Sequence, residues 1–231
     1  MYGVSLMSTS VLNNPKSIVR NYVPKVIPPL ENGDHLGARE FLRRYQTMPQ
    51  VKKAELVQGI VYMSSPVRIT QHGKPDNLVQ TWLGVYAIHT KSSEAATNTT
   101  VKFGPDDVTQ PDAVLRLFSE HGGRSWVDED GYLMGAPELV VEIAASSASL
   151  DLHEKFHTYR RAGVREYIVW RILDGELDWW VLEEDSFVRL AADEDGYIKS
   201  RVFPGLWLDV PALLEGDGAR MLAALEKGIK G

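Results

Sequence analysis

The segment from Leu139 to Ala144 constrains this chain most. It reads Leu-Val-Val-Glu-Ile-Ala, an almost continuous apolar run that is typical of a strand buried on both faces of a sheet. Successive side chains of a strand point to opposite faces, so Val141 and Ile143 share one face and Glu142 lies on the other. Burying a carboxylate is costly unless it is paired or binds a metal ion. The segment therefore predicts a central strand that carries an acidic group in need of a partner.

Helical and strand patterns alternate along the rest of the chain. We expect helices at 38–48, 77–90, 150–162, 211–214 and 219–229, and strands at 53–57, 60–63, 99–103, 111–118, 138–144 and 166–170. Three further segments, 176–182, 186–191 and 197–202, predict an antiparallel extension, and 119–137 a long surface loop. This order predicts an α/β fold, a single layered domain over 34–231 built around a mixed sheet. Residues 1–33 hold four prolines and predict a flexible N-terminal tail.

Composition narrows the function classes. The 231 residues include no cysteine, which excludes disulfides, zinc-thiolate sites, iron–sulfur clusters and cysteine nucleophiles. The 25 Lys and Arg residues against 31 Asp and Glu give a net charge of −6, which argues against a protein that coats DNA. No apolar run approaches the roughly 18 residues of a membrane helix, and we expect a cytoplasmic protein. The basic residues that could form a phosphate-facing rim, but are expected to be solvated, are Lys52, Lys53, Lys74, Lys102, Arg160, Arg161 and Arg165.

Two further carboxylates are predicted to lie near Glu142. Asp112 follows Pro111 at the start of a strand, and Glu55 lies in the first strand of the hairpin. Mg²⁺ prefers oxygen ligands and usually takes one or two carboxylates together with water and phosphate. Asp112 and Glu142 on neighbouring strands could form such a cradle. The alternative is a salt bridge between Glu142 and an arginine such as Arg165 or Arg171.

Lys155 lies on the helix that follows the Glu142 strand. It is four residues after Asp151, so the two side chains share one face of the helix. A lysine at this place could reach a phosphate or an attacking water molecule. The alternatives are a solvated Lys155 paired with Asp151, or an Asp151 that caps the helix together with Glu154.

Several strings, in order along the chain, carry a family resemblance. Residues 54–61, Ala-Glu-Leu-Val-Gln-Gly-Ile-Val, resemble the opening hairpin of the Uma-two family of restriction endonucleases. His72 matches that family's histidine, Pro111–Val114 its Pro-Asp strand, and Glu138–Ile143 its Glu-bearing strand. The stretches Asp151–Lys155, Tyr159, Gly163–Tyr167 and Phe203–Leu206 are similar to its closing signatures. The resemblance covers about residues 35–215.

The resemblance implies a restriction-endonuclease-like fold of the PD-(D/E)xK superfamily, with a mixed sheet flanked by helices. It implies a Mg²⁺-dependent (Mn²⁺ is also compatible) endonuclease that hydrolyses DNA and is expected to be a homodimer. The implied catalytic residues are Asp112, Glu142, Lys155 and Glu55, the implied metal ligands are Asp112, Glu142 and the carbonyl of Ile143, and the implied substrate or supporting contacts are His72, Asp151 and Tyr159. Lys155 would orient the attacking water or stabilise charge on the phosphate.

The chain departs from the superfamily pattern at two places. Ala144 occupies the lysine position of the Glu-x-Lys motif, and in Uma-two-like proteins the lysine lies on the following helix, here at Lys155. Residues 145–148 read Ala-Ser-Ser-Ala where the family often has Ser-Pro-Ser-Thr.

Two other functions remain open. One is a non-catalytic binding or assembly module, with an oligomer surface on the sheet extension at Trp179 and Trp180. Because these two adjacent side chains point to opposite faces of a strand, the alternative is that one of them belongs to the core. The other is a metal hydrolase with a substrate other than DNA and His72 as a ligand, which would favour Mn²⁺, Zn²⁺ or Fe²⁺. Convergence of Asp112, Glu142 and Lys155 within a few ångströms would favour an enzyme.

Overall fold

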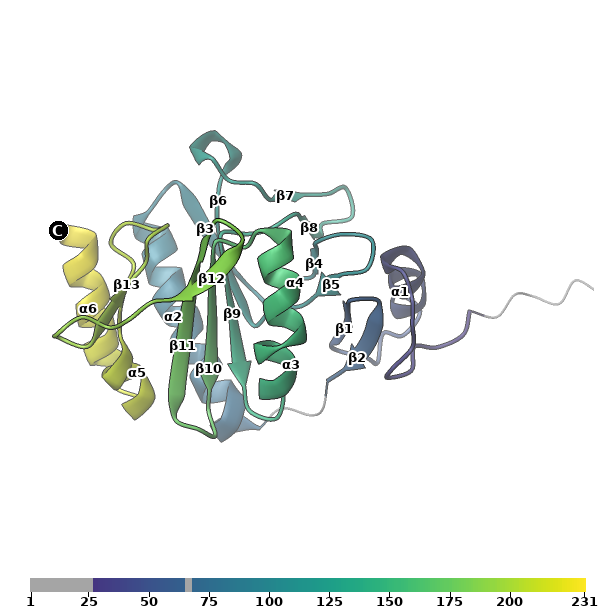
Figure 1. Ribbon diagram of the computed structural model, residues 1–231, viewed down its shortest axis with the longest axis horizontal. Coiled ribbons are helices and arrows are strands. Elements are labelled where there is room, and N and C mark those ends of the chain that lie inside the picture. The colour runs from purple at the N-terminus through teal and green to yellow at the C-terminus, as the bar shows by residue number, and fades with distance from the viewer. Residues whose placement is uncertain (1–26, 65–67) are drawn as a thin grey trace, which may run out of the picture.

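The computed structural model describes residues 27–64 and 68–231. Two six-stranded mixed sheets and one small antiparallel sheet are flanked by helices, which confirms the predicted α/β class (Figure 1). Residues 1–26 of the predicted tail lie outside the described residues, and Leu30 packs in a buried cluster with Phe41 and Leu56. No helix in the described ranges is long and apolar enough to cross a membrane.

The first sheet has the strand order β2-β1-β5-β4-β8-β7. Its strands are β1 (Ala54–Val57), β2 (Ile60–Met63), β4 (Val101–Lys102), β5 (Val108–Thr109), β7 (Trp126–Val127) and β8 (Leu133–Met134), and helix α1 (Ala38–Tyr45) packs against β1. The predicted hairpin is confirmed, and its turn at Gln58 and Gly59 has positive φ at both residues. The prediction of a plain loop over 119–137 is wrong in part. Two-residue strands such as β7 and β8 are too short to show an alternating pattern.

The second sheet has the order β12-β11-β10-β9-β6-β3. Its strands are β3 (Ser93–Thr97), β6 (Ala113–Leu117), β9 (Leu139–Ala144), β10 (Glu166–Arg171), β11 (Glu176–Glu183) and β12 (Ser186–Arg189). Strand β9 pairs parallel with β10 and antiparallel with β6, and all six of its residues are buried. The prediction of a central strand around Glu142 is therefore confirmed.

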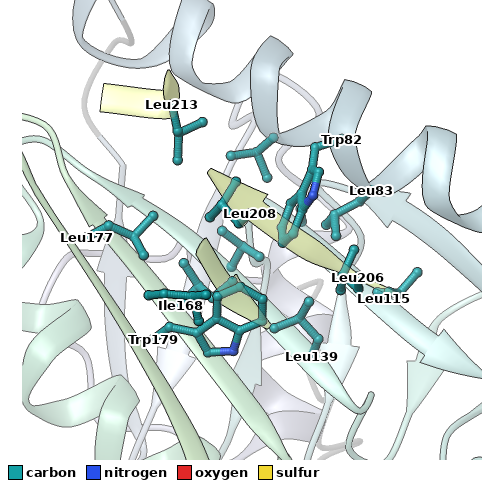
Figure 2. Packing of buried hydrophobic residues seen from close by; sticks show 14 of the residues in the cluster. Trp82, Leu83, Leu115, Leu139, Ile168, Leu177, Trp179, Leu206, Leu208 and Leu213 are labelled. Carbon is teal, nitrogen blue, oxygen red and sulfur yellow. The ribbon is translucent and has the colours of Figure 1, made fainter. Parts of the chain in front are cut away.

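Helices cover both faces of the second sheet. On one face lie α2 (Lys74–His89), α5 (Val210–Glu215) and α6 (Gly218–Lys230), over a core that contains Trp82 and Trp179 (Figures 1 and 2). Val141 and Ile143 belong to this core, whereas Val140 packs with Tyr159 on the opposite face. That face is covered by α3 (Ala148–Leu152) and α4 (Glu154–Ala162). By alternation along β9, Glu142 points toward α4.

The helix predicted over 150–162 is two helices. They meet at His153, whose φ of −120° and ψ of −80° break the helical path. Helix α4 ends as predicted at Gly163, which has a left-handed φ of 82°.

Two predictions about the C-terminal part need correction. The segment 197–202 does not join the extension of the large sheet, because β13 (Tyr197–Lys199) pairs with β14 (Trp207–Asp209) in a sheet of its own. The oligomer surface expected at Trp179 and Trp180 does not form from both side chains, because Trp179 is fully buried, as the alternative of one core tryptophan states, and the half-buried Trp180 packs edge-on against Phe156.

Candidate functional site

A pocket of ≈ 600 Å³ lies where the two sheets meet. Seven of the eight predicted site residues line it, namely Glu55, His72, Asp112, Glu142, Ile143, Asp151 and Lys155, and the eighth, Tyr159, hydrogen-bonds to Glu142. Glu55 comes from β1 of the first sheet, and Glu142 comes from β9 of the second. The pocket is therefore complete only when both sheets are in place.

The ammonium of Lys155 lies among three carboxylates. Its Nζ is 2.8 Å from Glu55 Oε2, 3.0 Å from Glu142 Oε1 and 3.3 Å from Asp151 Oδ1, and the residue is 2% exposed. Burial alone lowers the pKa of Lys155, but the charges of Glu142, Glu55 and Asp151 outweigh it and raise that pKa well above its usual value. The alternative of a solvated Lys155 is therefore wrong.

Glu142 is bound through one of its two oxygens. Oε1 accepts hydrogen bonds from Lys155 Nζ at 3.0 Å and from the Tyr159 hydroxyl at 2.7 Å. Burial is the main cause that raises the pKa of Glu142 to about 8, and the neighbouring charges of Asp151 and Asp112 raise it further while Lys155 opposes them. The predicted alternative partners are wrong, because Arg171 instead pairs with three acidic residues of its own hairpin and Arg165 is exposed.

Asp112 is held by three donors. Its Oδ1 lies 2.9 Å from Lys53 Nζ and 3.3 Å from His72 Nε2, and its Oδ2 accepts from the backbone N–H of Ile143 at 2.8 Å. Burial raises the pKa of Asp112, but the hydrogen bond from His72 and the charge of Lys53 outweigh it and hold that pKa well below its usual range. The bond from Ile143 fixes Asp112 directly beside Glu142.

Asp151 is not the helix cap that one alternative proposed. It lies inside α3, and its Oδ2 accepts a hydrogen bond of 2.6 Å from Ser147 Oγ. Its Oδ1 faces Lys155 at 3.3 Å but forms no hydrogen bond with any described residue. Asp151 therefore adds negative charge to the pocket rather than closing a helix end.

Two carboxylate oxygens remain able to hold a cation. Each carboxylate oxygen can accept about two hydrogen bonds. On Asp112, Lys53 and His72 occupy both positions of Oδ1, and Ile143 N–H occupies one position of Oδ2, which leaves one position of Oδ2 for a cation. Within the described ranges, no hydrogen bond reaches Glu142 Oε2. One oxygen from each of two carboxylates, with water and phosphate in addition, is a ligand set that suits Mg²⁺.

Within residues 27–64 and 68–231, no three His, Asp or Glu side chains are arranged to hold a metal ion together. Between the carboxylates of Glu55, Glu142 and Asp151, the central position is occupied by the Lys155 ammonium. The donors therefore fit a metal at Asp112 and Glu142, and the part of the Ile143 carbonyl stays a prediction.

Sequence reasoning missed Lys53 as a member of this cluster. It was grouped with the solvated rim, because one of two adjacent lysines beside a strand gives no signal of burial. Supporting donors were missed as well, among them the backbone N–H of Gln110, which donates to Glu55 at 2.7 Å. Burial alone does not mark a site, since Glu138 and Glu166 are fully buried and accept hydrogen bonds from backbone N–H groups, Glu138 from Leu117 and Glu166 from Arg201.

Comparisons with known proteins point in one direction. The sequence model of the Uma2 family, described as "Putative restriction endonuclease", matches residues 38–211. One similar solved structure is the crystal structure of a putative nuclease belonging to DUF820 from Anabaena variabilis ATCC 29413. The alignment covers 76% of this chain and 97% of that chain, with a TM-score of 0.59 and 15% identity, and supports the likeness of fold. None of the curated proteins compared with this chain matches it.

Proposed function

Since this chain belongs to the Uma2 family of putative restriction endonucleases, we propose that it is a divalent-metal-dependent nuclease that hydrolyses DNA phosphodiester bonds. One observation carries the proposal. Asp112, Glu142 and Lys155 converge in one pocket, and each of the two carboxylates keeps an oxygen position for a cation.

In the proposed site, Asp112 and Glu142 would hold Mg²⁺. When bound, the ion would lower the pKa of a water molecule and polarise the phosphate. The residues around the carboxylates keep them in position. Ile143 N–H holds Asp112, while Tyr159 and Lys155 hold Glu142 through Oε1, and no described residue donates a hydrogen bond to its Oε2.

The charges at the pocket suit a phosphodiester. Lys53 and Arg68 line it beside the carboxylates and bring positive charge to a protein whose net charge is −6, and His72 lines the same pocket. A protein with this overall charge should bind DNA weakly and with a steep dependence on salt.

The variant Asp112→Asn tests the proposal. It keeps the size of the side chain but removes the charge that a metal ion requires, so cleavage of plasmid DNA in Mg²⁺ should fall at least about 10²-fold. EDTA should abolish cleavage by the wild type. Gel analysis of plasmid nicking measures both effects, and thermal unfolding verifies that the variant is folded.

The matched control is Asp195→Asn, which removes one carboxylate at an exposed position outside the pocket and should leave cleavage unchanged. Full activity of Asp112→Asn would overturn the metal assignment. DNA binding by a wild type that never cleaves would instead support the non-catalytic binding module.

A further inference from the structure

The two lysines of the pocket differ in how many carboxylates surround them and in how deeply they are buried. We propose that Lys53 is the lysine that binds the substrate phosphate, and that Lys155 is a positioning residue which holds three carboxylates. This inference rests on the proposed function. It differs from the role that the family resemblance implies for Lys155.

Lys155 is enclosed by carboxylates. Three carboxylate oxygens lie within 3.3 Å of its Nζ, and one of them, Glu142 Oε1, accepts a hydrogen bond from it. Moving the ammonium toward a phosphate would take its charge away from three buried carboxyl groups, which is strongly unfavourable. With 2% of the residue exposed, Lys155 also offers almost no surface to a ligand.

Lys53 has the opposite properties. Among the described residues, its Nζ has one carboxylate partner, Asp112 Oδ1 at 2.9 Å, so two of its three donors remain. Its side chain is 21% exposed and lines the pocket.

The position of Lys53 is also the right one for a phosphate. Its partner Asp112 is a proposed metal ligand, so the Lys53 ammonium lies beside the place where a metal-bound phosphate has to enter. His72 contacts the same oxygen of Asp112, and Arg68 lines the same pocket. A charged donor held there in advance stabilises the charge that develops on the phosphate during hydrolysis.

Metal-free DNA binding tests the inference without relying on activity. The affinity of a fluorescein-labelled DNA duplex is measured by anisotropy in EDTA over a range of salt concentrations. Each lysine–phosphate contact contributes about 0.9 to the slope of log affinity against log salt. Lys53→Met should therefore reduce the slope by about one, and Lys53→Arg should restore it.

The matched control is Lys91→Met, which removes the same charge at an exposed residue beyond the C-terminal end of the 16-residue helix α2. Its slope should equal that of the wild type. In Mg²⁺, single-turnover cleavage by Lys53→Met should fall on the order of 10²-fold.

Chemical acetylation of the wild-type protein compares both lysines without a mutation. Mass spectrometry should find Lys53 acetylated in the free protein and protected severalfold by the duplex, with Lys155 unmodified in both samples. Acetylation of Lys155 that DNA suppresses, with Lys53 unaffected, would reverse the two roles and overturn the inference.

The outcomes separate the inference from the function on which it rests. If the wild type binds and cleaves DNA while Lys53→Met keeps the wild-type slope, the role of Lys53 is wrong and the nuclease function stands. If the wild type neither binds nor cleaves the duplex at any salt concentration, the proposed function is wrong and the inference falls with it.

Discussion

At the scale of single residues, the pocket is a compact set of buried ionisable groups. Glu55, Asp112, Glu142 and Asp151 are each at most 3% exposed, and Lys155 compensates three of them. Buried ion pairs contribute little net stability when complete, but losing one partner is costly. Stability alone therefore does not explain these buried groups, and a functional role does, with the rest of the fold compensating the cost of burying them.

Removing the central ammonium should have a large effect on stability. Lys155→Met leaves three buried carboxylates without their shared partner, and the free energy of unfolding should fall by about 3–5 kcal/mol. In contrast, Lys230→Met breaks an exposed pair with Glu226, whose side chains are 75% and 63% exposed, and should change stability by less than about 1 kcal/mol. Urea unfolding measures both. Equal effects of the two variants would contradict the account of Lys155 as the centre of the cluster.

The raised pKa of Glu142 should appear in the pH dependence of stability. Its pKa is about 8 in the folded protein and 4.5 ordinarily, so between these values the native state holds a proton that the unfolded chain has released. The free energy of unfolding then decreases as the pH rises through this window. Glu142→Gln holds no such proton, so its stability should decline less between pH 5 and pH 8.

Urea unfolding at pH 5, 6, 7 and 8 in EDTA measures this difference. The His72 pKa is also raised, chiefly by its hydrogen bond to Asp112. The stability that protonated His72 contributes is lost as the pH rises, and this loss is the same in the wild type and in Glu142→Gln. The lowered pKa of Asp112 acts at more acidic pH. Parallel curves for the wild type and Glu142→Gln would show that Glu142 is ionised throughout this window.

At the scale of elements, two helical glycines should respond in opposite ways to alanine. A Cβ on Gly84 in α2 would meet nothing within 4 Å, so Gly84→Ala should stabilise the protein by up to about 1 kcal/mol through helix propensity. A Cβ on Gly228 in α6 would lie 2.4 Å from Gly205 O and 2.8 Å from Trp207. Gly228→Ala should therefore destabilise by about 1–3 kcal/mol. Thermal unfolding distinguishes them, and stabilisation by both would mean that α6 does not pack closely on β14.

Most of the longer elements were predictable from the sequence, and most of the shortest were not. Strands β9 and β10 have six residues each and are largely apolar, and the hairpin β1–β2 is marked by its central glycine. Strand β4 falls within the predicted strand at 99–103, but β5, β7 and β8 have two residues each and leave no periodic signal, so one mixed sheet was expected where two exist. The break at His153 depends on backbone angles that no residue type there requires.

At the scale of the whole molecule, the site depends on the joining of two sheets. Glu55 and Glu142 come from different sheets and meet on the Lys155 ammonium. Sequence patterns could identify the carboxylates, because acidic residues within apolar runs are conspicuous. They could not identify the three carboxylates that surround Lys155 or the contact between Lys53 and Asp112, because both depend on how distant segments pack.

The homodimer stays a prediction.

Binding of Mg²⁺ to the metal-free protein is the most direct test of the central claim. Isothermal titration at pH 8 should detect binding to the wild type and none to Glu142→Gln, because the variant loses one of the two proposed carboxylate ligands. The experiment is repeated with a non-hydrolysable DNA duplex, so that a phosphate can complete the ligand set. Equal binding by both proteins, or no binding to the wild type with and without the duplex, would contradict a metal site at Asp112 and Glu142.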